Sequence, residues 1–239
     1  MRMQWRNSAA THCVLSWMNF AAPPAGVTWN YNRAELIADG VIHIIGVALG
    51  VAGAVILLVL TFNAARSVEP GSVVIYVIGL LAMLGASAAY NLWPMTPRKW
   101  LLRRFDHSAI YLLIAATYTP FLLRMKDGAV PLALLIVVWL TAAVGIVLKL
   151  RFPGRFDRLS IVLYLMLGWS GIAAAAPGAA ALHPLTLWLI AIGGVIYSVG
   201  VIFHVWERLR FHTAIWHGFV LTAAGVHYSA VLSCVLLAV

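Results

Sequence analysis

Apolar residues in this chain fall into seven long runs, separated by short joints of polar and turn-forming residues. The runs cover residues 36–64, 71–93, 105–123, 129–148, 159–176, 184–205 and 213–239. A helix needs about 20 apolar residues to cross ~30 Å of hydrocarbon, which most of these runs supply. The joints hold Pro, Gly or charge, which the interior of a membrane resists. The pattern therefore predicts an all-α, polytopic membrane protein with seven transmembrane helices.

The domain organisation follows from the same pattern. Residues 35–239 form the predicted seven-helix membrane domain, and residues 1–34 precede it as an N-terminal tail. The apolar stretch inside the tail is broken by Asn19, Pro23 and Pro24, so it fits a signal peptide poorly. We expect a loose or amphipathic cytoplasmic tail.

Composition excludes a soluble domain of this length. Hydrophobic residues make up 63% of the 239 residues and charged residues only 10%, against roughly 25% charged in soluble domains. The formal net charge of +9 comes from basic residues in the joints, where they orient helices. The chain has no basic helix or aromatic-interleaved patch of the kind that binds nucleic acid. The expected environment is therefore a lipid bilayer, with no nucleic-acid partner.

The distribution of Lys and Arg predicts the orientation. Of the 16 such residues, all but Arg66, Arg124 and Lys126 lie in the tail or in joints that would share its side of the membrane. Positive residues concentrate on the cytoplasmic side. The N-terminus is therefore expected in the cytoplasm and the C-terminus outside, with the protein in the cell (inner) membrane.

Unusual polar residues gather in the cytoplasmic third of the predicted helices. Glu35, Asp39 and His43 are spaced i, i+4, i+8 and so share one face of the first helix. Ionisable residues inside a membrane bundle usually face its interior and mark a functional site. We therefore expect a polar cavity that opens towards the cytoplasm. Its other expected lining residues are Ser87, Tyr90, Asn91, Asp106, His212, Thr213, His217 and His227.

These residue types suit metal-assisted chemistry. Imidazole nitrogens and carboxylate oxygens can hold Zn²⁺ with an open position for water, and a second carboxylate can orient that water. The chain has no HExxH motif and no GxSxG nucleophile elbow. His217 is the candidate ligand that is hardest to explain as a simple interfacial residue, whereas His227, about 15 Å deeper, fits a buried, neutral, hydrogen-bonded histidine.

Five stretches of the chain resemble a known family. They are ELIADGVIHIIG (35–46), GASAAYNLWP (85–94), RRFDHSAIYLLIAATYTPF (103–121), IGGVIYSVGVIFH (192–204) and AIWHGFVLTAAGVHYSAV (214–231). They are similar to the hemolysin III proteins of bacteria, within the wider progestin and adiponectin receptor family. The resemblance implies seven helices and a cytoplasmic N-terminus. In receptor members it implies zinc held by three His, one from Ser-x-x-x-His on the second helix and two from His-x-x-x-His on the seventh. A third-helix Asp there contacts the zinc-bound water, and these members resemble hydrolases of ceramide-like lipid amides.

This chain departs from the implied ligand set at two positions. Asn91 stands where the second-helix His is expected, and Thr213 stands where the first seventh-helix His is expected. Amide and hydroxyl oxygens are weaker zinc ligands than imidazole. His217 and Asp106 remain, and His212 is one position, or 100°, away from the expected face.

Two alternatives stay open for the site. A rearranged metal site would use His217, His43 and Asp39, with Asp106 as the catalytic residue that orients water. A metal-free site would have Asn91, Asp106 and His217 hydrogen-bonded to one another. The loss of two His favours a non-enzymatic protein that senses a lipid or small ligand, acts as a channel, or is cytolysin-like. The alternative is a metal-dependent lipid amide hydrolase, so zinc and a lipid ligand or substrate are both left open.

Overall fold

The computed structural model describes residues 32–63, 68–125, 129–152, 154–171 and 181–237, and the elements in those residues are α-helices. Seven helices follow one another along the described chain. They are α2 (Arg33–Asn63), α3 (Pro70–Leu92), α4 (Pro97–Arg124), α5 (Ala129–Arg151), α6 (Asp157–Trp169), α8 (Pro184–Val205) and α9 (His212–Leu236). The all-α prediction is confirmed for this part of the chain. The predicted tail lies almost wholly outside the described residues.

Five of the seven helices are long and apolar enough to cross a membrane: α2, α3, α5, α8 and α9. The two others fall short for different reasons. α4 is 28 residues long but includes the basic sequence PRKWLLRR and the Asp106–His107 pair. α6 has only 13 residues and is followed by a stretch outside the described residues. The structure is that of a polytopic membrane protein, and seven crossings remain a prediction.

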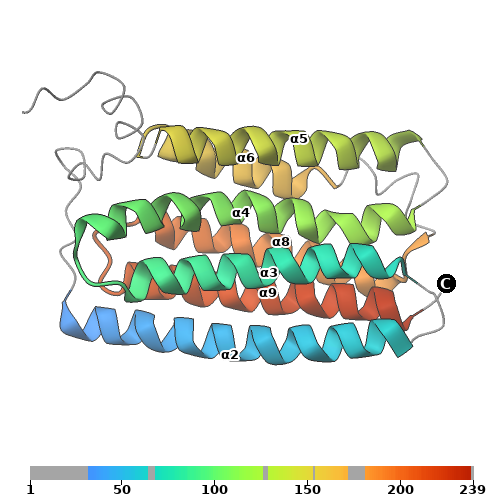
Figure 1. Ribbon diagram of the computed structural model, residues 1–239, viewed down its shortest axis with the longest axis horizontal. Helices are drawn as coiled ribbons and strands as arrows, with labels where there is room; N and C mark the ends of the chain where they lie inside the picture. The colour runs from blue at the N-terminus through green and yellow to red at the C-terminus, as the bar shows by residue number, and fades with distance from the viewer. Residues whose placement is uncertain (1–31, 64–67, 126–128, 153, 172–180, 238–239) are drawn as a thin grey trace, which may run out of the picture.

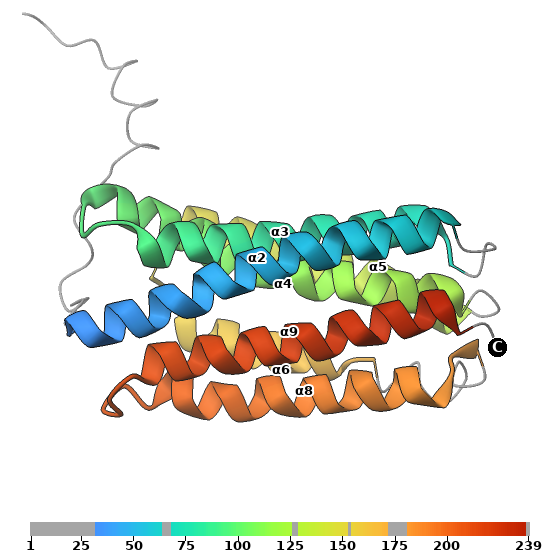
Figure 2. The same ribbon diagram turned by 90° about the horizontal axis from the view of Figure 1, so that it is seen from below.

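The helices run side by side along the long axis of the molecule (Figures 1 and 2). α4 is the central helix, since it contacts α3, α5, α6 and α9. α2 contacts both α3 and α9, and α8 packs against α9. Residues from the first and last helices of the described chain can therefore meet.

The distribution of apolar and ionisable side chains is the opposite of that in a soluble helical bundle. Large apolar side chains on the outer faces are exposed, among them Ile44 and Leu49 of α2 and Leu140 of α5, each at 62%. Asp39 and His43, on the inner face of α2, are each only 7% exposed. Apolar residues that face outwards and ionisable residues that face inwards are what a lipid solvent requires.

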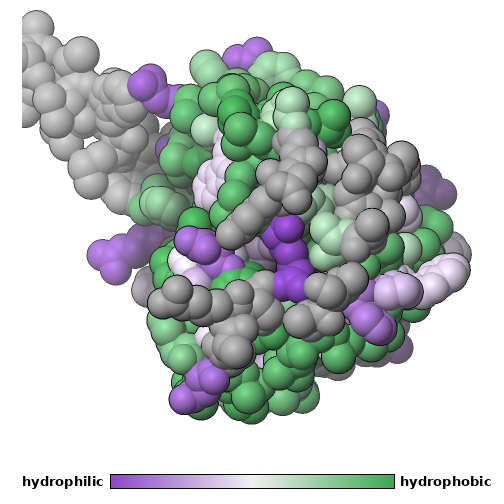
Figure 3. All heavy atoms as spheres, turned by 90° about the vertical axis from the view of Figure 1, so that its right-hand side faces the viewer, coloured by the Kyte–Doolittle hydropathy of each residue, from purple (hydrophilic) through white to green (hydrophobic). Residues whose placement is uncertain are grey.

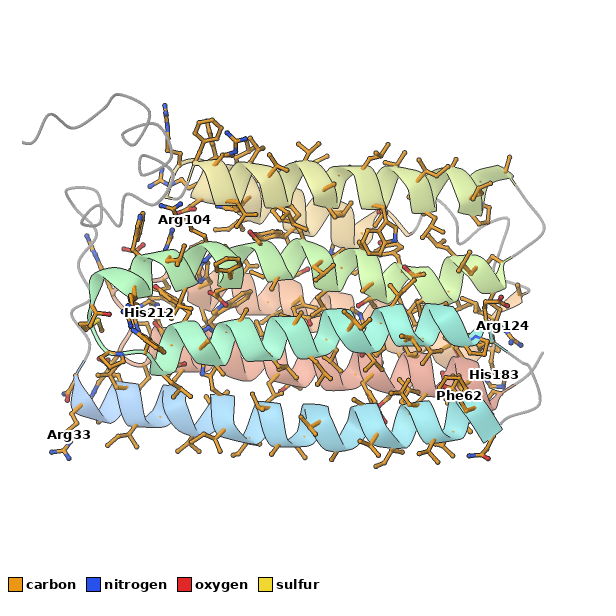
Figure 4. All side chains as sticks on the ribbon, in the orientation of Figure 1. Arg33, Phe62, Arg104, Arg124, His183 and His212 are labelled. Atoms are coloured by element: carbon orange, nitrogen blue, oxygen red, sulfur yellow. The ribbon has the colours of Figure 1, made fainter. Side chains whose placement is uncertain are left out.

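The two ends of the bundle differ. Figure 4 shows Arg33, Arg104 and His212 at one end, and Phe62, Arg124 and His183 at the other. The end marked by Arg33 also carries the joints after α3, α5 and α8, with most of the Lys and Arg of the described chain. We call it the basic end. Figure 3 views the opposite end, where hydrophobic residues surround a smaller number of hydrophilic ones.

Two contacts at the basic end fix the helix termini that carry the site. Lys99, in the first turn of α4, is 2% exposed, and its Nζ donates to the carbonyl oxygens of Tyr90, Asn91 and Trp93 at 2.9, 3.2 and 3.0 Å. These carbonyls end α3 and lack helical partners, so a cation there satisfies them. Glu35 Oε1 accepts from the backbone N–H of Phe211 at 3.1 Å, which holds the start of α9 against α2.

Phe211 has a left-handed backbone conformation, with φ of 62°. Such a conformation is strained for a residue with a side chain and persists only where its surroundings hold it. The Glu35 carboxylate supplies part of that support. The turn that it holds aims the first residues of α9, including Thr213 and His217, into the bundle.

Candidate functional site

The centre of the site is a cluster of Asp39, His43 and His217, in which one ligand atom from each residue lies within 4.8 Å of the others. His217 Nδ1 lies 2.6 Å from Asp39 Oδ1, and the side chains of both are about nine-tenths buried. The rings of His43 and His217 meet edge to face, with centroids 4.5 Å apart. The i, i+4 spacing of Asp39 and His43 places both on the face of α2 that meets α9.

The hydrogen bonds of His43 define its tautomer. Its Nδ1 lies 2.8 Å from the backbone carbonyl of Asp39, which can only accept, so Nδ1 carries the proton. In a neutral ring Nε2 is then an acceptor. Asn91 Nδ2 donates to this nitrogen at 3.2 Å, and Ser87 Oγ lies at the same distance. The Nε2 lone pair of His43 is therefore directed towards α3.

Asn91 is further fixed within α3. Its amide nitrogen lies 3.0 Å from the carbonyl oxygen of Ser87 and 3.4 Å from Ser87 Oγ. The amide thus presents N–H groups to His43 and Ser87, so it does not offer a metal-binding oxygen to the cluster.

Asp106 lies close to the cluster but is not one of its three members. Its Oδ2 is 3.4 Å from His107 Nδ1, and it interacts with Ser87 and His217. In the metal-free alternative, Asn91, Asp106 and His217 were expected to form hydrogen bonds to one another. The structure instead pairs Asn91 with His43 and His217 with Asp39. The reason is geometric, because α2 lies between α3 and α9 and supplies both partners.

The remaining predicted residues surround this cluster at different depths. Thr213 Oγ1 lies 3.4 Å from His212 Nε2, and His212 Nδ1 is a buried atom without a hydrogen-bond partner. The rings of Tyr90 and His107 meet edge to face, with centroids 6.4 Å apart. His227 lies apart from the cluster, and its Nε2 bonds to the carbonyl of Ile190 at 3.1 Å. His227 therefore has the contacts of a structural histidine between α8 and α9.

Several charged residues whose predicted role was only to orient helices form buried contacts in the structure. Asp157, at the start of α6, pairs with Arg103 of α4 at 2.7 Å and with the buried Lys149 of α5 at 2.6 Å. Burial raises the pKa of Asp157, but the two cations outweigh this effect and lower the pKa to about 2. These two ion pairs join α4, α5 and α6 at the basic end. A charge count cannot distinguish Lys149 or Lys99 from exposed neighbours, because burial depends on how each helix is rotated.

A cavity of about 1420 Å³ extends from this region through the bundle. It is bounded by α4, α6, α8 and α9, with contributions from α2, α3 and α5. Its lining includes Glu35, Ser87, Tyr90, Asn91, Asp106, His212, Thr213, His217 and His227. The residues at its other end are apolar, among them Phe121, Met125 and Leu182. The cavity therefore has one polar and one apolar end.

The three-His zinc set implied by the family resemblance does not fit this chain. Asn91 directs its amide N–H groups to His43 and Ser87, and Thr213 offers only a hydroxyl. The cluster of Asp39, His43 and His217 has a different donor set, two imidazoles and a carboxylate, which suits a transition metal. Tetrahedral Zn–N bonds of about 2.0–2.1 Å place neighbouring ligand atoms about 3.4 Å apart. His217 Nδ1 and Asp39 Oδ1 are closer than this, at 2.6 Å, so a metal would have to replace the hydrogen bond between them.

Comparison with known proteins identifies relatives along most of the chain. Residues 32–228 match the model of a family described as "Haemolysin-III related". The chain is 39% identical to "Hemolysin-3 homolog" from Bacillus subtilis (strain 168) over 198 residues, covering 83% of this chain and 93% of that protein. It is 37% identical to "Hemolysin-3" from Bacillus cereus over 206 residues, covering 84% and 92%. It is also 31% identical to human "Monocyte to macrophage differentiation factor" over 165 residues, covering 66% and 67%.

Proposed function

The chain belongs to the haemolysin III family of multi-pass membrane proteins, and we propose that it binds an amphipathic lipid without chemically converting it. In this proposal the chain crosses the cell (inner) membrane seven times, with its N-terminus in the cytoplasm and its C-terminus outside. The concentration of Lys and Arg at the basic end supports this orientation. The cavity then opens towards the cytoplasm.

The observation that carries the proposal is the graded polarity of the cavity. At the basic end its walls hold Asp106, His107 and His217, which can hydrogen-bond a polar headgroup. Further along, Leu113, Ile114 and Phe121 line it. A ligand gains most free energy in such a site when its apolar surface meets apolar walls and its polar groups meet hydrogen-bond partners.

Thr117 and Tyr118, midway along the cavity, do not disturb this gradient. Thr117 Oγ1 donates to the carbonyl of Leu113 at 2.7 Å, so its methyl group is left to contact a ligand. The Tyr118 hydroxyl donates to the carbonyl of Gly168 at 2.6 Å and accepts from the N–H of Gly171 at 2.7 Å. These polar atoms are satisfied within the protein, so the middle of the cavity suits a hydrocarbon chain.

A bulky substitution inside the cavity tests the proposal. Ala191 of α8 lines the cavity, whereas Val195, one turn later, is 51% exposed on the outer face. We expect Ala191→Trp to fill the cavity and lose an N-acylethanolamine that the wild type retains in native mass spectrometry of the purified chain. Val195→Trp adds the same indole on the outer face and should retain the ligand. Equal retention by both variants would contradict the proposal.

A second candidate function is metal-dependent hydrolysis of a lipid amide. It is favoured by the convergence of Asp39, His43 and His217. A metal bound there would activate a water molecule, and Asp106, whose carboxylate interacts electrostatically with His217, would orient it. Metal analysis separates the two functions. Near-stoichiometric zinc in chelator-free preparations that disappears in His217→Ala would favour hydrolysis, whereas metal-free protein that still binds lipid would favour the first proposal.

A further inference from the structure

One face of α4 follows the cavity along almost its whole length. Asp106, Ile110, Leu113, Thr117, Phe121 and Met125 all line the cavity. Their spacing of three or four residues keeps them on a single face of the helix. At ~1.5 Å per residue, the distance from Asp106 to Met125 along α4 is about 29 Å.

This length exceeds the depth of one leaflet. The hydrocarbon core of a bilayer is ~30 Å thick, so the chains of a single leaflet occupy about 15 Å. A ligand with its headgroup near Asp106 would have room for a chain that passes the middle of the bundle. The opposite wall extends equally far, because α8 contributes lining residues from Leu187 to Val205.

The described side chains at the apolar end of the cavity belong to the hydrophobic core. Leu182 is 3% exposed, Met125 7% and Phe121 5%, and all three belong to the main hydrophobic core. Leu187 lines the cavity there and packs against the same core. An acyl chain that reached these residues would meet close-packed side chains, which can move only slightly to make room for it.

From this geometry we propose that the cavity binds a single-chain, long-chain amphiphile and that Met125, Leu182 and Leu187 set the longest chain that fits. The inference rests on the proposed lipid-binding function, and it adds the ligand class and the residues that select chain length. The headgroup lies at the Asp106 end and the terminal methyl group at the Leu187 end. Each methylene group that the cavity accommodates keeps its contact with apolar walls, and each one beyond the limit has no space.

Substitutions at Leu187 test the limit in both directions. The probes are N-acylethanolamines with lauroyl, palmitoyl, stearoyl and behenoyl chains, offered as an equimolar mixture to the purified full-length chain. Native mass spectrometry then reads the bound distribution. In Leu187→Trp the retention of the longest bound homologue, relative to the lauroyl one, should fall about tenfold. In Leu187→Ala the distribution should move towards longer chains, which keeps the test valid if the Trp variant folds poorly.

The matched control is Leu185→Trp, at the same end of α8 but 48% exposed on the outer face. It should leave the wild-type distribution unchanged. If the wild type binds these probes and Ala191→Trp does not, but both Leu187 variants keep the wild-type chain preference, the chain-length limit is overturned while lipid binding stands. If the wild type and Ala191→Trp are alike in binding none of the probes, the proposed function fails and the inference fails with it.

Discussion

Gly193 of α8 packs directly against the His227 ring of α9, and an alanine there should destabilise the bundle. A Cβ atom at this position would lie 2.3 Å from Cδ2 and 2.4 Å from Nε2 of His227. Carbon atoms in contact normally lie about 3.5–4.0 Å apart, so the overlap exceeds 1 Å. The His227 ring has little freedom to move, because Nε2 bonds to the carbonyl of Ile190 at 3.1 Å and the ring lies beside Tyr197.

Overpacking of this kind typically costs about 1–3 kcal/mol. For a chain of this size, 1 kcal/mol lowers the melting temperature by about 2–4 °C, so Gly193→Ala should melt about 2–12 °C below the wild type. The assay is thermal unfolding in one detergent, followed by intrinsic tryptophan fluorescence. Gly225→Ala in α9 is the control, because no neighbouring atom lies within 4 Å of its Cβ position. It should be neutral or stabilising, since alanine is the better helix former.

A double substitution separates crowding from a general effect of alanine. His227→Ala removes the ring that the new Cβ would meet. The Gly193→Ala change should therefore cost less in the His227→Ala background than in the wild type, which gives a positive coupling in a double-mutant cycle. If Gly193→Ala is no worse than Gly225→Ala, or if the two effects simply add, α8 and α9 are not packed as described.

Three further predictions concern the basic end. Lys99→Met should lower the free energy of unfolding by about 2 kcal/mol, because three partly buried carbonyls at the end of α3 lose their donor. The same change at the exposed neighbour Arg98 should have little effect. The stability that Asp157 contributes should be complete above its ordinary pKa of 3.8 and should be lost as the pH falls from there to about 2. The melting temperatures of the wild type and Asp157→Asn should therefore converge over that interval. Glu207→Gln, at an exposed position, should follow the wild type throughout. The double variant Asn91→His, Thr213→His restores the implied three-His set and should gain near-stoichiometric zinc by elemental analysis, and a metal content equal to that of the wild type would show that these positions do not converge on His217.

The positions of the helices could largely be predicted from the sequence, because the requirement for apolar surface in lipid is strong and local. The runs at 71–93 and 184–205 correspond within a residue to α3 and α8. The apolar run at 105–123 placed the start of its helix too far along the chain, because α4 begins at Pro97. Proline is favoured in the first helical turn, and the charged residues after it are good helix formers that an apolar pattern passes over.

The contents of the site could be predicted only in part. The spacing of Asp39 and His43 correctly placed both on one face of α2, and this depends on helix geometry alone. The partners of His217 and Asn91 could not be read in the same way, because they depend on the rotation of α3 and α9 about their axes. The burial of Lys99 depends on where the α3–α4 joint folds back, which composition does not encode.

Mapping where a bound lipid chain lies tests most directly whether an amphiphile is held inside the bundle. An N-acylethanolamine with a photoreactive diazirine midway along its chain can be crosslinked to the purified protein and its attachment sites identified by peptide mass spectrometry. We expect crosslinks to the cavity face of α4, at Leu113, Ile114 and Thr117. Ala191→Trp should abolish them and Val195→Trp should preserve them. Crosslinks confined to outward-facing residues such as Leu140 and Val144, unaffected by Ala191→Trp, would contradict this expectation.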